Sequence, residues 1–111
     1  MRIETHKHGA VSVVKPGGSI AGDDAEKLRK HLIEARTESL GRVLLDLASV
    51  PLVDSRTLEV MLEIAELQAD GGRTLKVCGL RDVVREVLEL TGVIGSVEVF
   101  DEPGSAVRSF R

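Results

Sequence analysis

Residues 43–58 read VLLDLASVPLVDSRTL, and this stretch decides the predicted fold. Residues 43–47 are nearly all apolar, as expected of a central strand that is covered on both faces. A loop with Pro51 follows, and Asp54 and Ser55 then offer two consecutive N-cap residues. Apolar residues come next at helical spacing: Leu58, Met61, Leu62, Ala65 and Ala69. The stretch therefore predicts a buried strand, a connecting loop and an amphipathic helix.

The same alternation of strand and helix continues toward the C-terminus. Gly71-Gly72 is a strong helix stop, after which residues 74–78 form the next predicted strand. Residues 97–100 form a last short strand, and the polar tail 101–111 includes a turn of helix around Ala106 and Val107. Between these strands, residues 80–90 have helical spacing, with four inward positions expected: Val83, Val84, Val87 and Leu88.

Toward the N-terminus, two short strands precede a helix. Residues 2–6 and 10–15 are the strand candidates, and the link Lys7-His8-Gly9 between them predicts a hairpin. Asp23 is the expected N-cap of the helix, with Glu26 three residues later as in a capping box. Four apolar residues form one stripe along this helix: Ala25, Leu28, Leu32 and Ala35.

Together these segments give the element order ββαβαβαβ. The alternation of strands and helices implies parallel pairing with right-handed crossovers, and the initial hairpin makes the sheet mixed. We therefore predict an α/β fold: a mixed, mostly parallel sheet with helices packed on it and a short C-terminal helix. The length of 111 residues matches one domain, residues 1–111. Leu44, Leu45 and Leu62 are expected to supply much of the core packing.

The composition excludes several classes of function. The net charge of -3 gives no electrostatic attraction to nucleic acid or to an anionic membrane surface. Phe100 and Phe110 are the only aromatic residues, which is too few for a base-stacking platform. Residues 1–6 lack the apolar run of a signal peptide, and no apolar segment approaches the roughly 18–20 residues of a membrane helix. We therefore expect a cytoplasmic protein that binds neither nucleic acid nor membranes.

Residues that could support catalysis occur singly rather than in constellations. The glycine-rich run 16–22 lacks the Lys-Ser/Thr pair of a P-loop, and the following Asp23-Asp24 would repel phosphate. Asp46 is interpreted as a polar residue near a strand end that bonds local backbone. Cys78 is interpreted as a small buried hydrophobe, and the three histidines as solvated side chains. The sequence therefore predicts no enzyme, no cofactor and no metal site.

The start of the second predicted helix is the remaining candidate site. The free backbone N–H groups and the positive dipole end of a helix N-terminus suit an anion. A hydroxyl there, such as that of Ser55, can also be a phosphorylation switch, because a phosphate changes the local charge by about -1.5 to -2. An ordinary N-cap at Asp54-Ser55 is the alternative that the residues themselves leave open.

Residues 43–55 also resemble a known family. The segment VLLDLASVPLVDS is similar to the signature of STAS domains, the sulphate-transporter and anti-sigma-factor-antagonist fold. That signature has an apolar strand, Asp-Leu-Ser, a short loop, an apolar pair, and then Asp-Ser-Ser-Gly-Leu at the start of a helix. The resemblance extends over almost the whole chain, because the family shares the ββαβαβαβ order, a similar length and a final short helix. It implies a small, non-enzymatic protein-binding domain.

The resemblance also implies a partner and a mode of regulation. Free-standing members typically bind an anti-sigma factor that is also a serine kinase, and phosphorylation by that kinase switches the binding off. The acceptor in the family is the second residue after the motif aspartate. Alignment of Asp54 on that aspartate places Arg56 at the acceptor position and Thr57 in place of the glycine, while Ala21 stands where many switchable members carry an aspartate. Ser55 and Thr57 are the flanking hydroxyls left as candidate phosphorylation sites.

The expected docking surface is the loop before the second helix together with the N-terminal half of that helix. Its residues are Asp54, Ser55, Arg56, Thr57 and Glu59. The favoured function is binding to an anti-sigma factor of the serine-kinase type, without the usual phospho-switch. Two alternatives stay open: a small-ligand or nucleotide-binding sensor that holds a phosphate at the same helix N-terminus, and a STAS subunit of a larger stressosome-like or lipid-transport complex.

Overall fold

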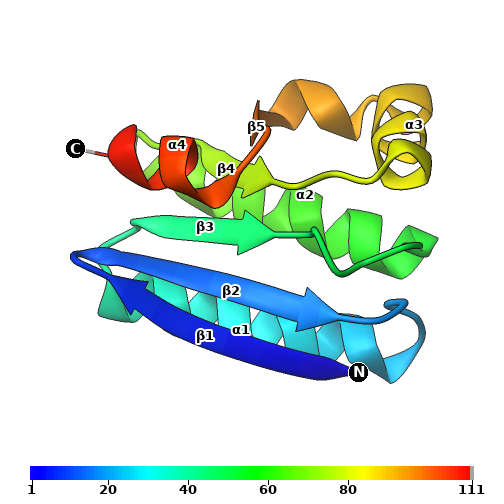
Figure 1. Cartoon of the computed structure of the whole chain (residues 1–111), viewed down its shortest axis with the longest axis horizontal. Helices are drawn as coiled ribbons and strands as arrows, with labels where there is room; N and C mark the ends of the chain where they lie inside the picture. Colours follow the sequence, from blue (N-terminus) through cyan, green and yellow to red (C-terminus); the bar gives the residue numbers. More distant parts are fainter. Residues whose placement is uncertain (111) are drawn as a thin grey trace.

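Strands and helices alternate along the chain in the computed structural model, which describes residues 1–110 (Figure 1). Arg111, the last residue of the predicted tail, lies outside the described residues. The elements in chain order are β1 (Arg2–His8), β2 (Val11–Gly17), α1 (Asp23–Glu38), β3 (Val43–Asp46), α2 (Ser55–Asp70), β4 (Leu75–Cys78), α3 (Asp82–Thr91), the short 3₁₀ helix η1 (Val93–Ser96), β5 (Val97–Phe100) and α4 (Pro103–Arg108). The predicted order ββαβαβαβ and the short C-terminal helix are therefore confirmed. The helix η1 was not predicted.

The five strands form one sheet in the order β1-β2-β3-β4-β5. β1 and β2 are antiparallel, and the other neighbours are parallel, so the sheet is mixed and mostly parallel as predicted. The predicted hairpin is confirmed, but its turn is not Lys7-His8-Gly9: β1 extends to His8 and β2 starts at Val11, which leaves Gly9 and Ala10 as the turn. Pairing of Lys7 and His8 with β2 satisfies backbone groups that a longer loop would leave to solvent.

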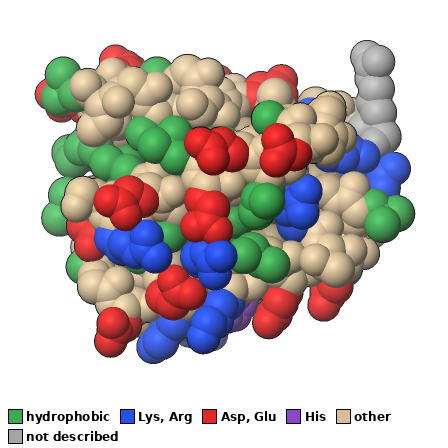
Figure 2. Space-filling model, turned by 180° about the vertical axis from the view of Figure 1, so that it is seen from behind, with side chains coloured by type: hydrophobic (Ala, Val, Ile, Leu, Met, Phe, Trp, Pro, Cys, Tyr) green, Lys and Arg blue, Asp and Glu red, His purple; other side chains and the backbone are tan. Residues whose placement is uncertain are grey.

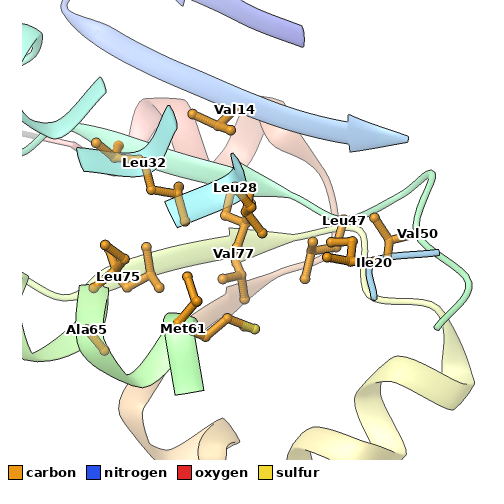
Figure 3. Packing of buried hydrophobic residues seen from close by; sticks show 14 of the residues in the cluster. Val14, Ile20, Leu28, Leu32, Leu47, Val50, Met61, Ala65, Leu75 and Val77 are labelled. Carbon is orange, nitrogen blue, oxygen red and sulfur yellow. The ribbon is translucent and has the colours of Figure 1, made fainter. Parts of the chain in front are cut away.

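Alternate residues of the central strands enter two separate cores. The larger core lies between the sheet and the helices α1, α2 and α3, and it contains Leu45 of β3. Val77 of β4 belongs to the same core (Figure 3). The smaller core lies on the opposite face, where Leu44 and Cys78 pack with Ala106 of α4. Successive side chains of a strand point to opposite faces of a sheet. A strand covered on both faces must therefore be apolar nearly throughout, which is why β3 has that composition.

The first helix begins one residue earlier than its sequence suggests. The N-cap is Gly22, with φ of 58°, and no side chain caps the helix. A positive φ is accessible to glycine without steric cost, so the chain turns sharply at this position. Asp23, the predicted N-cap, instead lies in the first turn, where its charge suits the positive end of the helix dipole. The predicted apolar stripe is confirmed: Ala25, Leu28, Leu32 and Ala35 are all buried.

The inward faces of α2 and α3 differ in part from the prediction. Leu62 is 37% exposed, Ala69 is exposed, and Val83 is 50% exposed. The buried side of α2 carries six residues at spacings of three and four: Thr57, Val60, Met61, Ile64, Ala65 and Gln68. An apolar residue at the flank of such a stripe can be either buried or exposed to solvent. Which of the two it is depends on how the helix packs against the sheet.

Candidate functional site

The loops after β2 and β3 meet at one end of the molecule. Because the two strands are parallel neighbours, their C-terminal ends lie at the same edge of the sheet, where ligands and partners of α/β folds commonly bind. An isolated parallel bridge joins Ile20 to Val53, and the Ile20 amide donates a 3.3 Å hydrogen bond to the carbonyl oxygen of Leu52. These contacts place the starts of α1 and α2 side by side (Figure 1).

Asp54 connects these two helix starts through its carboxylate. Oδ1 accepts hydrogen bonds from the backbone N–H of Thr57 at 2.9 Å and from Thr57 Oγ1 at 2.8 Å. Oδ2 accepts a hydrogen bond from the Gly22 N–H at 3.1 Å, across 32 positions of sequence. The bond from the Thr57 N–H is the main cause that lowers the pKa of Asp54, because it stabilises the ionised carboxylate. The predicted N-cap role of Asp54 is confirmed.

The five residues of the expected docking surface do not share one environment. Ser55, Arg56 and Glu59 are exposed, and Asp54 is half-buried. Thr57 is fully buried, because its hydroxyl turns inward to Asp54, so the structure does not place it on the exposed surface with the others. Three of the five thus form an accessible group at the N-terminal end of α2.

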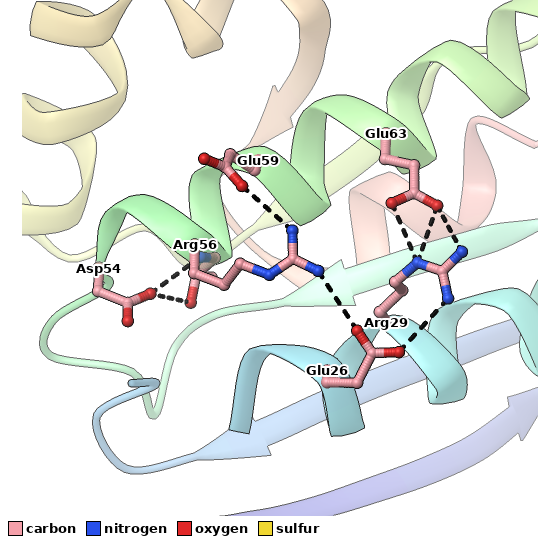
Figure 4. A network of polar contacts seen from close by, with 7 residues as sticks. Glu26, Arg29, Asp54, Arg56, Glu59 and Glu63 are labelled. Atoms are coloured by element: carbon pink, nitrogen blue, oxygen red, sulfur yellow. Dashed lines mark hydrogen bonds and ion pairs between the residues drawn. The ribbon is translucent and has the colours of Figure 1, made fainter. Parts of the chain in front are cut away.

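Arg56 pairs with carboxylates on two helices. Nη1 contacts Glu59 Oε2 at 3.1 Å within α2, and Nη2 contacts Glu26 Oε2 of α1 at 3.4 Å. Glu26 also contacts Arg29 at 3.5 Å, and Arg29 contacts Glu63 of α2 at 2.8 Å (Figure 4). We call these five residues the α1–α2 ion-pair ladder. Acidic and basic side chains alternate across the corresponding face of the molecule in Figure 2.

Two members of the ladder, Arg29 and Glu63, have shifted pKa values. The hydrogen bond between Arg29 and Glu63 lowers the pKa of Glu63 and raises the pKa of Arg29, because the bond favours the charged form of each partner. The sequence pattern includes the i,i+3 pair Arg56–Glu59, but it gives no signal for the pairs between helices. Glu26, assigned from its spacing to a capping box, instead pairs with arginines of both helices.

Two residues outside this surface have the local roles predicted for them. Asp46 is buried, and its Oδ1 accepts a hydrogen bond from the Ala48 N–H at 3.0 Å, which confirms a bond to local backbone. Cys78 is fully buried, and burial is the main cause that raises the pKa of its thiol to about 12. A thiol with that pKa has almost no thiolate at neutral pH, so Cys78 is a packing residue.

The geometry also bears on the binding of an anion at the start of α2. The Thr57 N–H, one of the donors that a phosphate would need there, already donates to the Asp54 carboxylate. The negative charge of that carboxylate lies at the same helix end, and it would repel an incoming phosphate. The helix N-terminus is therefore occupied by the protein's own anion. Along residues 1–110, no helix is both long and apolar enough to cross a membrane.

Known proteins share this fold over nearly the full chain. A family model described as STAS domain matches residues 2–106. A curated relative from Bordetella bronchiseptica, whose name places it among the anti-sigma factor antagonists, is 26% identical over 111 residues, which are 100% of this chain and 96% of the relative. An anti-sigma F factor antagonist from Paenibacillus polymyxa is 23% identical over 108 residues, with 96% and 92% of the two chains covered.

A solved structure gives the same result in three dimensions. The crystal structure of an anti-sigma factor antagonist from Mycobacterium paratuberculosis superposes with a TM-score of 0.84 at 20% sequence identity. The superposition covers 97% of this chain and 92% of that one. The likeness therefore concerns the whole fold, including the strand–loop–helix segment that carries Asp54.

Proposed function

The chain belongs to the STAS domain family, and we propose that it works as an anti-sigma factor antagonist, a non-enzymatic domain that binds an anti-sigma factor of the serine-kinase type. Its relatives from Bordetella and Paenibacillus carry names of that class, and they match almost the full chain. A partner held by such a domain would release its sigma factor, so the domain would regulate transcription through binding alone.

The observation that carries this proposal is the exposed group at the N-terminal end of α2. Ser55, Arg56 and Glu59 present polar and charged side chains on a rigid helix whose start is held by Asp54. The side chain of Arg56 is 48% exposed, and its pairs with Glu26 and Glu59 fix the guanidinium at the surface. A preorganised charged surface of this kind gives a partner orientation and specificity at low entropic cost.

Arg56 also determines the proposed regulation. In the family that the chain resembles, the phosphate acceptor stands at this position, but an arginine has no hydroxyl to accept phosphate. Ser55 and Thr57 are displaced from it by about 100° around the helix, since 3.6 residues complete a turn. Thr57 is in addition buried beneath Asp54. We therefore propose that the partner is bound without the usual kinase-driven release.

The alternative of a sensor that holds a phosphate at the start of α2 has less support. The Asp54 carboxylate takes the Thr57 N–H and puts negative charge where the phosphate would lie. A thermal-shift comparison with and without ATP and GTP separates the two functions. Stabilisation by a nucleotide that is lost on Asp54→Ala would favour the sensor.

Partner binding is tested with charge-reversal variants. We expect Arg56→Glu and Glu59→Lys to abolish binding to the cognate anti-sigma factor in isothermal titration calorimetry. The melting temperature should change little, because exposed substitutions usually cost less than about 0.5 kcal/mol. Lys7→Glu, which reverses an exposed charge on β1, is the matched control and should bind normally. Retained binding in both α2 variants would overturn the proposed surface.

The absence of a phospho-switch is tested separately. The wild-type protein and an Arg56→Ser variant are incubated with the cognate kinase and ATP and analysed by mass spectrometry. We expect no phosphate on the wild type and phosphate at position 56 of the variant. Stoichiometric phosphorylation of Ser55 or Thr57 in the wild type would restore a switchable antagonist and contradict the proposal.

A further inference from the structure

A cleft of about 340 Å³ lies at the end of the molecule opposite the Asp54 loop. It is formed where α1 and α2 end. Arg36 of α1 and Arg73, which follows α2, both line it, and Leu40 lies at its edge. Among the described residues, no carboxylate lines this cleft. The charges that face into it are therefore positive.

Arg36 is held in a fixed position by the second helix. Its Nε donates to Gln68 Oε1 at 2.9 Å, and its Nη2 donates to the carbonyl oxygen of Leu67 at 2.8 Å. Gln68, which is almost fully buried, donates in turn from Nε2 to the carbonyl oxygen of Gly41 at 2.8 Å. A guanidinium has five N–H donors, so Arg36 keeps donors beyond these two bonds for a ligand in the cleft.

Arg73 contributes the second guanidinium of the cleft. Its side chain lies against Gly41 so closely that a Cβ at Gly41 would be 2.8 Å from Arg73 Cδ and 2.9 Å from Nε. The residue is half-buried, yet its guanidinium makes no hydrogen bond or ion pair with any of residues 1–110. A planar guanidinium in this state is suited to bind a carboxylate or phosphate with two parallel hydrogen bonds.

Leu40 adds an apolar contact at the edge of the same cleft. It is 76% exposed, and its φ of 55° lies in the left-handed region, where a branched residue is strained. Glycine would relieve that strain and would remove the exposed apolar surface. Residues in strained backbone conformations cluster at functional sites, and Leu40 is such a residue at the edge of a cleft.

We propose that this cleft binds a small organic anion in which a phosphate or carboxylate is attached to a short apolar group. The anionic group lies between Arg36 and Arg73, and the apolar group packs on Leu40. The site is separate from the partner surface at the other end of α2, so its failure would leave the proposed antagonist function untouched. Glu38 and Asp70 end the two helices nearby, but neither lines the cleft.

The proposal is tested by two-dimensional NMR titration of the full chain with hexyl phosphate. We expect saturable shifts of the amides of Leu40, Gly41, Gly71 and Arg73, with a dissociation constant of about 1 mM or lower. Inorganic phosphate should bind at the same amides more weakly, and hexanol should leave them unchanged. Absence of saturable shifts there, equal affinity for the two phosphates, or equal binding of hexanol would overturn the proposed ligand class.

Two variants and one control locate the contacts. Arg73→Gln should weaken hexyl phosphate binding at least about tenfold, as expected for loss of a charged hydrogen bond. Leu40→Gly should weaken hexyl phosphate by about threefold, leave inorganic phosphate unchanged and raise the melting temperature. Arg85→Gln on α3 removes the same charge away from the cleft and should bind as the wild type does. If Arg73→Gln binds like Arg85→Gln, the site is refuted, and the Leu40→Gly result decides the apolar contact independently.

Discussion

The two ends of α2 are held in different ways. At the N-terminal end, Asp54 accepts the N–H of Thr57, a residue three positions further along the chain. At the C-terminal end, Gln68 bonds Gly41 and Arg36, which are 27 and 32 positions away. The first arrangement combines this local cap with one tertiary hydrogen bond from the Gly22 N–H, whereas both Gln68 bonds of the second are tertiary and depend on the packing around the ends of α1 and α2.

This difference has a consequence for the surfaces that the two ends expose. A local cap uses a short side chain, so Ser55, Arg56 and Glu59 stay free to face solvent beside it. The tertiary contacts at the other end draw long side chains inward and leave a cleft between the helices. One end therefore presents exposed polar and charged side chains, which we propose as the protein-binding surface, and the other presents a cleft lined by two arginines, which we propose as the anion site.

The largest effect is expected between the two ends, in the core that both share. Leu45→Ala should lower the free energy of unfolding by about 2–5 kcal/mol, because Leu45 is fully buried and its truncation leaves a cavity. Leu62→Ala, on the 37% exposed flank of α2, should cost clearly less. Urea unfolding of both variants measures the difference. Equal losses would contradict the assignment of Leu62 to the flank.

Gln68→Ala tests the tertiary end of α2. We expect a loss of about 1–3 kcal/mol, because the Gly41 carbonyl would lose a buried hydrogen-bond donor and the half-buried Arg36 guanidinium would lose an acceptor. Glu66→Ala, an exposed substitution on the same helix, is the control and should stay within about 0.5 kcal/mol. Thermal and urea unfolding provide the measurement. If the Gln68 variant is as stable as the control, the hydrogen bonds of the Gln68 side chain do not stabilise the C-terminal end of α2.

Asp54→Ala tests the local end. Loss of an N-cap typically costs about 0.5–2 kcal/mol, and here the Gly22 N–H also loses its acceptor. Asp54→Asn keeps an acceptor oxygen and should recover much of the loss. Stability of the alanine variant equal to wild type would contradict the role of Asp54 in joining the two helix starts.

The acid stability profile sharpens the same test. The pKa of Asp54 is lowered in the folded protein, so its ionised carboxylate stabilises the fold. This stabilisation is fully present above the pKa of about 3.9 in the unfolded chain, and it is lost as the pH falls through the lower pKa of the folded protein. The stability gap between wild type and Asp54→Asn should therefore shrink below about pH 4. A gap that is constant from neutral to acid pH would mean that the charge of Asp54 adds nothing.

The smallest effect is expected in the α1–α2 ion-pair ladder. Arg56→Gln should cost less than about 1 kcal/mol, because exposed ion pairs are screened by solvent. The cost should fall further in high salt. Urea unfolding of wild type and variant at two ionic strengths measures the loss of stability and its dependence on salt. A loss of stability as large as that of Gln68→Ala would mean that the exposed ion pairs contribute as much as Gln68 to holding α1 against α2.

Sequence patterns predicted the elements of this fold well, for physical reasons visible at particular residues. Apolar runs such as β3 and stripes such as that of α1 reflect local periodicity, which burial imposes on every strand and helix. Asp54 was identifiable as a cap because its partner is three residues away. The helix start at Gly22 and the flank positions Leu62 and Val83 were misjudged, because local patterns do not specify how far an apolar stripe turns toward the sheet.

The sequence by itself determined the order of the elements, the buried central strand and the cap at the start of α2, since each depends on residues close together in the chain. Tertiary structure alone decided which side chains meet across the helices. The ladder from Glu26 to Glu63, the burial of Thr57 and the cleft between Arg36 and Arg73 depend on contacts between α1, α2 and the loops around them. Such contacts depend on the three-dimensional packing of distant segments, and no periodicity along the chain encodes them.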